Sequence, residues 1–270
     1  MENMVKKISS EDFAKKIRLH VLEMIFNGRS SHIASAFSMS DILGVLFNEI
    51  LNIDPDNVSN PKRDRFILSK GHAGAAVYAA LSLKGFFPEA DLLKHYQNGS
   101  MFSGHISHHV KGVEFSTGSL GHGLGVICGI SIRCKSEGHG NKNYVLLSDG
   151  ELNEGSNWEA LLFASHHKLN NLTIIVDRNH YQSIHNTEET LALEPLKRKF
   201  EAFNLDTYEI NGHDLGEIRD TLNLSQEGPK IIICNTVKGK GVSFMENNIQ
   251  WHYTPPSEDE YKIAKKELLK

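Results

Sequence analysis

The chain opens with apolar side chains spaced as on one face of a helix. In residues 11–26 the apolar positions recur at intervals of three and four behind Ser10. This pattern predicts an amphipathic helix that Ser10 caps and Gly28 ends. Residues 39–50 repeat the pattern behind Ser40. We therefore expect a helical N-terminal segment.

Further along, short apolar runs alternate with helical patterns. The runs that predict strands are 65–69, 144–148, 172–176, 207–210 and 230–237. The helical patterns cover 71–83, 158–167, 195–203 and 215–222, and a helix rich in small residues starts at 126. Near-continuous apolar strands that alternate with helices are typical of parallel sheets covered on both faces.

The expected fold class is α/β, a doubly wound, mainly parallel sheet with helices on both faces. In such folds ligands bind beyond the carboxyl ends of the strands, so functional residues should follow each strand directly. We find no internal repeat or linker, and we expect a single domain over residues 1–270 with a helical N-terminal segment and a short C-terminal tail.

Composition and charge exclude several classes of protein. The net charge is -4 at pH 7 and the pI is about 6.4, with basic residues scattered among acidic ones. We therefore expect neither nucleic acid nor a membrane surface as partner. No apolar run approaches the ~20 residues that cross a bilayer, and residues 1–10 lack the apolar core of a secretory signal. Cys128, Cys134 and Cys234 have no metal-site spacing and predict reduced, buried thiols. A cytoplasmic location follows.

Polar residues follow two of the predicted strands. Asp149 and Gly150 come directly after the run 144–148, and Asn179 is the third residue after the run 172–176. If these strands are neighbours, a carboxylate and an amide oxygen share one crevice, and such ligands suit Mg²⁺ that also binds phosphate oxygens. The alternative is that Asp149-Gly150 forms a turn and that Asn179 caps a strand end.

A glycine-rich segment and many histidines add candidate chemistry. Residues 116–125 contain four glycines ahead of a helix, which suits close approach to a diphosphate or, equally, close helix packing. The segment matches neither the dinucleotide fingerprint nor the P-loop. The chain has 15 histidines, and imidazole can transfer protons near neutral pH. A zinc site at His105, His108 and His109 lacks companion ligands.

Taken in order, these segments resemble the diphosphate-binding half of transketolase, in the split form where that half is a separate polypeptide. The matching segments are Ser31-His32, 64–72, Gly104-His105, 117–121, 149–179, 211–214 and Trp251-His252. The family signature is a GDG followed after about 25 to 30 residues by Asn. Here 28 residues, 151–178, separate Gly150 from Asn179. The resemblance covers about residues 12–253 and implies the thiamine-diphosphate-binding fold.

The resemblance implies a role for individual residues. It assigns thiamine diphosphate and Mg²⁺, or Ca²⁺ or Mn²⁺ in its place, as cofactors. The metal ligands are Asp149, Asn179 and the main-chain carbonyl of Tyr181. The cofactor contacts are His72, Gly118, Ser119, Leu120, Gly150, Asn179 and His252. The residues with catalytic roles are His32, His105 and His252, similar in position to the substrate-channel histidines, and Glu154, similar to a glutamate at the subunit contact. Lys238 and Lys240 face either the diphosphate or solvent.

The resemblance also implies an activity and a partner. A transketolase transfers a two-carbon ketol unit from a ketose donor to an aldose-type acceptor. It needs a glutamate from the pyrimidine-binding half, which a separate subunit would supply here. We expect an α2β2 heteromer that is inactive without that subunit.

Several positions depart from the family pattern. Ser148 replaces the first glycine of GDG, Ser119 and His122 stand where proline and glutamine are usual, and Tyr253 follows His252 in place of glycine. Ala34-Ser35 also departs from a glycine-rich family segment. The departures gather at the substrate mouth, which indicates sugar-phosphate or modified-sugar substrates other than the pentose-pathway aldoses.

Three other functions stay open at this point. The chain could be a subunit of another thiamine diphosphate enzyme, such as deoxyxylulose-phosphate synthase or the first component of a 2-oxo acid dehydrogenase; the histidines favour sugars. It could be a scaffold without catalytic residues beside an active partner. A magnesium-dependent phosphohydrolase is disfavoured because no second carboxylate accompanies Asp149.

Overall fold

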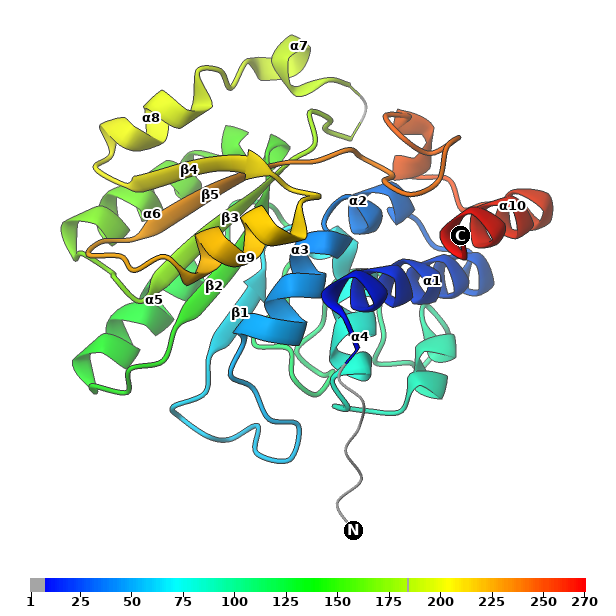
Figure 1. The fold of residues 1–270 in the computed structure, drawn as a ribbon, viewed down its shortest axis with the longest axis horizontal. Coiled ribbons are helices and arrows are strands. Elements are labelled where there is room, and N and C mark those ends of the chain that lie inside the picture. Colours follow the sequence, from blue (N-terminus) through cyan, green and yellow to red (C-terminus); the bar gives the residue numbers. More distant parts are fainter. Residues whose placement is uncertain (1–7, 184) are drawn as a thin grey trace.

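The fold is built on one parallel sheet. The computed structural model describes residues 8–183 and 185–270. The sheet has five strands in the order β1-β2-β3-β5-β4, and every neighbouring pair is parallel (Figure 1). The strands are β1 Arg65–Leu68, β2 Asn143–Ser148, β3 Leu172–Arg178, β4 Asp206–Asn211 and β5 Lys230–Asn235. The predicted α/β class is confirmed.

Helices cover both faces of the sheet, because the middle positions of the central strands β2, β3 and β5 are apolar on both sides. Side chains alternate across a strand, so Val145 and Ile174 enter one core, whereas Tyr144 and Ile175 enter the other. The first core is closed by α5 Gly123–Ser136, α6 Gly155–His166 and α8 Leu196–Ala202. The second is closed by α1 Ser10–Gly28, α2 Ile33–Ser38, α3 Ser40–Val45, α4 Gly74–Leu83 and α9 Leu215–Asn223.

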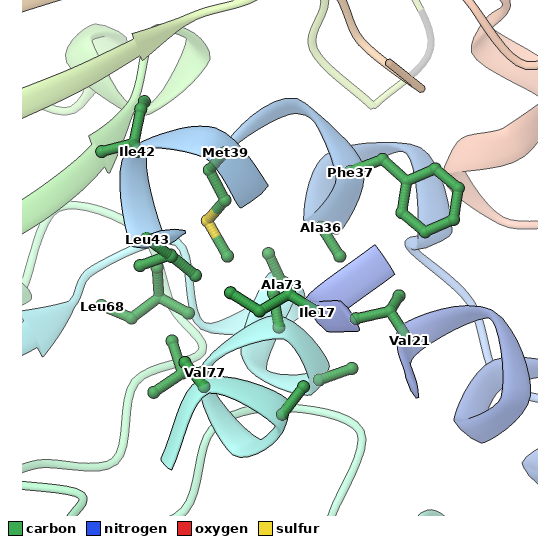
Figure 2. Close-up of a cluster of buried hydrophobic side chains, with 14 of the residues drawn as sticks. Ile17, Val21, Ala36, Phe37, Met39, Ile42, Leu43, Leu68, Ala73 and Val77 are labelled. Atoms are coloured by element: carbon green, nitrogen blue, oxygen red, sulfur yellow. The ribbon is translucent and has the colours of Figure 1, made fainter. Parts of the chain in front are cut away.

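The second core holds the N-terminal helices against the sheet. Figure 2 shows Ile17 and Val21 of α1 near Phe37 of α2 and Val77 of α4, with Leu68 of β1 in the same cluster. These side chains are almost completely buried. Each contributes about 1.5–3 kcal/mol of hydrophobic free energy relative to exposure. This packing fixes the loops that carry His32 and His72.

Three expectations about the elements need correction. Ser9 caps α1, since its side chain accepts from the Asp12 N–H, whereas Ser10 lies inside the helix. The helix expected at 39–50 is interrupted: α3 passes into a π-helix, Leu46–Ile50. The C-terminal residues form helix α10 Glu258–Leu268 rather than a tail, with a capping box at Ser257 and Leu268 packed near Gly241.

The remaining helical segments are short, and several lie at strand ends. They are the 3-10 turns Gly71–Ala73, Glu89–Lys94, Gly150–Asn153 and Ile249–His252, and helix α7 Thr187–Leu191. None of the helices in the described part of the chain is both long and apolar enough to span a membrane. The single-domain expectation stays a prediction.

Candidate active site

Strands β2 and β3 are neighbours, so their ends meet as the sequence suggested. Ser148 pairs with Asp177 across the two strands, and the Asp149 N–H donates to the Asp177 carbonyl at 3.2 Å. The Asp149 carboxylate then reaches the tip of β3, where its Oδ2 accepts from the His180 N–H at 2.6 Å. His180 has a φ of 68°, a backbone conformation that is uncommon outside glycine and that gathers at functional sites.

A second buried carboxylate, Asp177, lies behind the first. Its Oδ2 accepts from Lys70 Nζ at 2.5 Å and from Ser38 Oγ at 2.6 Å, and Asn179 Nδ2 donates to it at 3.1 Å. Burial opposes ionisation, but Lys70 outweighs it and lowers the pKa of Asp177. Sequence reasoning did not assign Lys70 or Asp177; the signal for both was a charged residue at or just past the end of an apolar strand.

A pocket opens above these strand ends. Its volume is about 60 Å³. Its lining residues are Ser35, Lys70, His72, Leu120, Ser148, Gly150, Asn179, Tyr181, Gln182, Ser183, Lys238 and His252. Asp149 is fully buried directly next to Gly150 and is not itself part of the pocket wall.

The expected cofactor contacts are therefore only partly gathered. His72, Leu120, Gly150, Asn179 and His252 line the pocket. The other two, Gly118 and Ser119, are exposed on the preceding turn and do not line it. Of the metal ligands expected beside Asp149, Asn179 accepts from the Tyr181 N–H through Oδ1 at 3.1 Å, which leaves that oxygen a second lone pair.

Four histidines lie together at the mouth of the pocket. The ring of His32 is 5.1 Å from His72, 5.7 Å from His105 and 4.8 Å from His252, measured between centroids. His32 has a φ of 73°, and its N–H donates to the His252 carbonyl at 2.8 Å. The fold thus brings together residues that are far apart in the sequence.

The imidazoles are held neutral. Burial, followed by the charges of His105, Lys238 and Lys70, lowers the pKa of His32 to about 4. Burial and then Lys238 lower the pKa of His252 to about 3. At neutral pH each ring therefore carries one N–H donor and one acceptor nitrogen.

Lys238 and Lys240, the two lysines expected to face either the diphosphate or solvent, lie in different surroundings. Lys238 is 1% exposed, donates to the Gln182 carbonyl at 3.1 Å and lies 3.2 Å from Nδ1 of His252. Burial, followed by the charge of Lys70, lowers the pKa of Lys238 to about 8. Lys240 is instead half-exposed and lies 3.4 Å from Glu246. Lys238 faces the pocket and Lys240 does not line it.

A carboxyl group that sequence reasoning missed holds the glycine-rich turn. Glu151 is buried, and its side chain accepts from the Gly121 N–H at 2.8 Å and from the hydroxyl of Ser69. It thereby fixes the turn against the ends of β1 and β2. Glu154 is exposed at the start of α6, next to Gly121, and does not line the pocket.

The donor set suits a hard cation. Within residues 8–183 and 185–270, no three His, Cys, Asp or Glu side chains gather as a metal site. The oxygens of Asp149 and Asn179 are the kind that Mg²⁺ takes when phosphate completes its coordination. The buried ammonium groups of Lys70 and Lys238 add positive charge where an anion would lie. The residues present therefore fit a metal-bound diphosphate.

Comparison with known proteins identifies the family. Residues 9–269 match the model of the transketolase thiamine diphosphate-binding domain. The chain is 41% identical over 262 residues to one subunit of the apulose-4-phosphate transketolase of Actinobacillus succinogenes, covering 96% of this chain and 95% of that one. It is 36% identical over 269 residues to a 6-deoxy-6-sulfo-D-fructose transketolase subunit of a Clostridium species, covering 98% of each.

Solved structures agree. Transketolase from Campylobacter jejuni superposes with a TM-score of 0.89 at 31% identity over 96% of this chain, and that from Leishmania mexicana with 0.91 at 28% over 97%. The chain spans 42% of the length of each. The chain belongs to the transketolase family of thiamine diphosphate-dependent transferases and corresponds to the cofactor-binding domain. The expected family, fold and thiamine diphosphate cofactor are confirmed.

Proposed function

We propose that the chain is the diphosphate-binding subunit of a transketolase that transfers a two-carbon ketol unit from a ketose donor to an aldose-type acceptor. The observation that carries the proposal is the pocket at the ends of β1–β3, where two buried lysines, Asn179 and a cluster of neutral histidines converge. The decarboxylating alternatives take a simple 2-oxo acid as donor, whereas His32, His105 and His252 favour a sugar.

Mg²⁺ is the proposed metal ion. Asp149, Asn179 and the main-chain carbonyl of Tyr181 would hold it, while His72, Leu120 and Gly150, with Gly118 and Ser119 on the adjoining turn, would contact the cofactor. Burial and the charge of Asp177 raise the pKa of Asp149, so a cation beside this carboxylate would favour its ionised form. When bound, thiamine diphosphate supplies the carbon nucleophile of the reaction.

The histidines act on the substrate in this proposal. His32, His105 and His252 bind sugar hydroxyls and move protons during carbon–carbon cleavage and ligation. Nδ1 of His32 lies 2.8 Å from Ser31 Oγ and Nδ1 of His252 lies 3.2 Å from Lys238 Nζ, so the Nε2 atom of each of these neutral rings remains for the substrate. Modified sugars are the favoured substrates, since two of the similar proteins are named for apulose-4-phosphate and for a sulfo-sugar.

A second subunit completes the site. The chain spans 42% of the length of the solved transketolases, and two similar proteins are named as subunits. We propose a separate pyrimidine-binding subunit that supplies the glutamate and assembles with this chain as α2β2, with the exposed Glu154 at the subunit contact. A cytoplasmic location belongs to the same proposal and is supported by three buried, unpaired cysteines.

Reconstitution tests the proposal. The purified chain, loaded with thiamine diphosphate and Mg²⁺, should show no ketol transfer from a ketose donor to an aldose, and adding the pyrimidine-binding subunit should produce it. Full turnover by the isolated chain would refute the partner requirement. Release of CO₂ from pyruvate by the pair would instead identify a decarboxylating enzyme. If Asp149→Ala leaves the activity of the pair intact, the chain is a scaffold.

A further inference from the structure

Arg178 is a buried charged residue that the proposed function does not use. It is the last residue of β3, and its side chain leaves the strand on the face opposite to Asp177 and Asn179. Its Nη1 donates to Asp149 Oδ2 at 3.2 Å and to Thr187 Oγ1 at 2.7 Å. The residue is 1% exposed, so burial of this cation requires partners that balance it.

The second terminal nitrogen of Arg178, Nη2, binds the segment 187–194. Nη2 donates to Glu188 Oε1 at 2.8 Å and to Glu194 Oε1 at 2.9 Å. Glu188 in turn accepts from the Leu193 N–H at 3.2 Å, which closes the segment 187–194 around the guanidinium. A planar group with five fixed donors can join three carboxylates in this way, whereas a lysine ammonium cannot reproduce the fork.

The hydrogen bonds of Asp149 show what the contact does. Oδ2 accepts from Arg178 and from the His180 N–H at 2.6 Å, whereas Oδ1 accepts only the Gly150 N–H at 2.8 Å among the described groups. A carboxylate offers about four acceptor positions. Oδ2 is thus fully used and Oδ1 keeps one position. Oδ1 is also the oxygen hydrogen-bonded to Gly150, a residue that lines the pocket.

Charge repulsion rules out a simple affinity role. A cation 3.2 Å from Asp149 would by itself oppose a second cation there. Glu188 and Glu194 offset the charge of Arg178, so the carboxylate keeps its negative charge for the metal. What Arg178 adds is therefore orientation.

We propose that Arg178 is a positioning residue: it holds Oδ2 of Asp149 so that Oδ1 faces the metal, and it links metal binding to the order of segment 187–194. The inference rests on the proposed function, in which Asp149 is a metal ligand. Groups that orient metal ligands typically contribute 10–100-fold in metal affinity. Coupling is reciprocal, so metal binding should in turn stabilise the segment.

The test measures Mn²⁺ affinity by electron paramagnetic resonance of the free ion, on the full chain with saturating thiamine diphosphate. Arg178→Met should weaken Mn²⁺ binding at least tenfold, and Arg178→Lys should fall between this variant and the wild type. Glu189→Gln is the control: it removes a carboxylate of the same segment that is exposed and pairs with His185, and its affinity should stay within about threefold. Hydrogen exchange in 187–194 should slow on Mn²⁺ binding in the wild type but not in Arg178→Met.

The variant Asp149→Asn distinguishes an error in the proposed metal site from an error in the inference about Arg178. If it binds Mn²⁺ like the wild type, the proposed metal site is wrong. If Asp149→Asn loses the ion while a folded Arg178→Met keeps wild-type affinity, only the inference about Arg178 is overturned. Should Arg178→Met fail to fold, Arg178→Lys decides: weaker binding supports the inference, and wild-type affinity overturns it.

Discussion

At the scale of single residues, the partners of the buried charges set what each can do. Asp177 is neutralised by Lys70 at 2.5 Å, and its pKa is lowered although burial opposes this. Asp149 has the reverse balance, because burial and then the Asp177 charge raise its pKa. Asp177 is therefore a structural counter-ion of Lys70, and Asp149 is the carboxylate that an added cation would stabilise more.

Neutral His252 makes stability depend on pH. Its pKa is about 3 in the folded chain, against 6.5 when exposed, so between pH 6.5 and 3 the unfolded chain binds more protons. The free energy of unfolding should therefore fall as the pH falls, by about 2 kcal/mol from this residue at pH 5. Urea titrations at pH 7 and 5 measure the effect. In His252→Gln the free energy of unfolding should fall less between pH 7 and 5. An equal fall would show that His252 is not the source of the pH dependence.

At the scale of elements, an ion-pair cluster joins distant parts of the fold. Arg18 of α1 forms a two-armed pair with Asp41 of α3, at 2.8 and 2.6 Å, and His213 before α9 contacts the same carboxylate at 2.7 Å. His213 Nε2 accepts from the Val237 N–H at 2.8 Å. The cluster therefore positions the loop that carries the pocket's Lys238.

Breaking this cluster should destabilise the fold. Asp41→Asn removes the charge that balances the buried Arg18, and loss of one partner of such a pair costs about 3 kcal/mol. Burial opposes ionisation, but the hydrogen bonds of His213 and Arg18 lower the pKa of Asp41 to about 2, so the contribution is present above pH 3.8 and lost towards pH 2. Urea unfolding at pH 7 measures it. Arg219→Gln, at a more exposed ion pair, should cost less than 1 kcal/mol.

Two glycines of α5 should respond oppositely to alanine. A Cβ on Gly123 would lie 2.5 Å from Ser69 Oγ, whereas one on Gly125 meets nothing within 4 Å in the described chain. Gly123→Ala should therefore lower the free energy of unfolding by about 2 kcal/mol through overpacking. Gly125→Ala should raise it by about 0.5–1 kcal/mol through helix propensity. Thermal unfolding of the two variants compares them, and equal effects would show that Gly123 does not pack against Ser69.

At the scale of the whole molecule, the pocket lies at the carboxyl ends of the strands, where the chain passes from several strands into the loops that follow them. Residues from the ends of β1, β2, β3 and β5 and from the α1–α2 loop converge there. Ligands of open parallel sheets bind at such edges. Occupation of the pocket should thus tighten the entire fold rather than one loop.

Cofactor and metal should stabilise the chain jointly. Thiamine diphosphate and Mg²⁺ together should raise the melting temperature more than the sum of their separate effects, because each neutralises the charge of the other. A ligand present at 100 times its Kd adds about 2.7 kcal/mol to the free energy of unfolding. Differential scanning calorimetry measures this. Asp149→Asn should remove the joint effect, and a joint effect that persists in that variant would contradict metal binding at this carboxylate.

The sequence by itself determined the parallel α/β sheet and the places of Asp149 and Asn179 just after two strands, whereas the pairing of these two strands came from the structure. Both follow from local information: an apolar run of strand length, and the polar residue directly after it. The glycine-rich turn and the histidine positions were also visible, because each lies beside a residue type with a particular backbone or proton chemistry.

Only the tertiary structure decided the partners. Lys70 and Asp177 are 107 residues apart and Arg178 is 29 residues from Asp149, so no local pattern connects them. The contact of Ser10 with Glu49 of the π-helix likewise joins residues that no local pattern connects. Pairing of buried charges is decided by which strand ends and loops packing brings together, and the free energy that selects these pairs arises only once the surrounding core has excluded water.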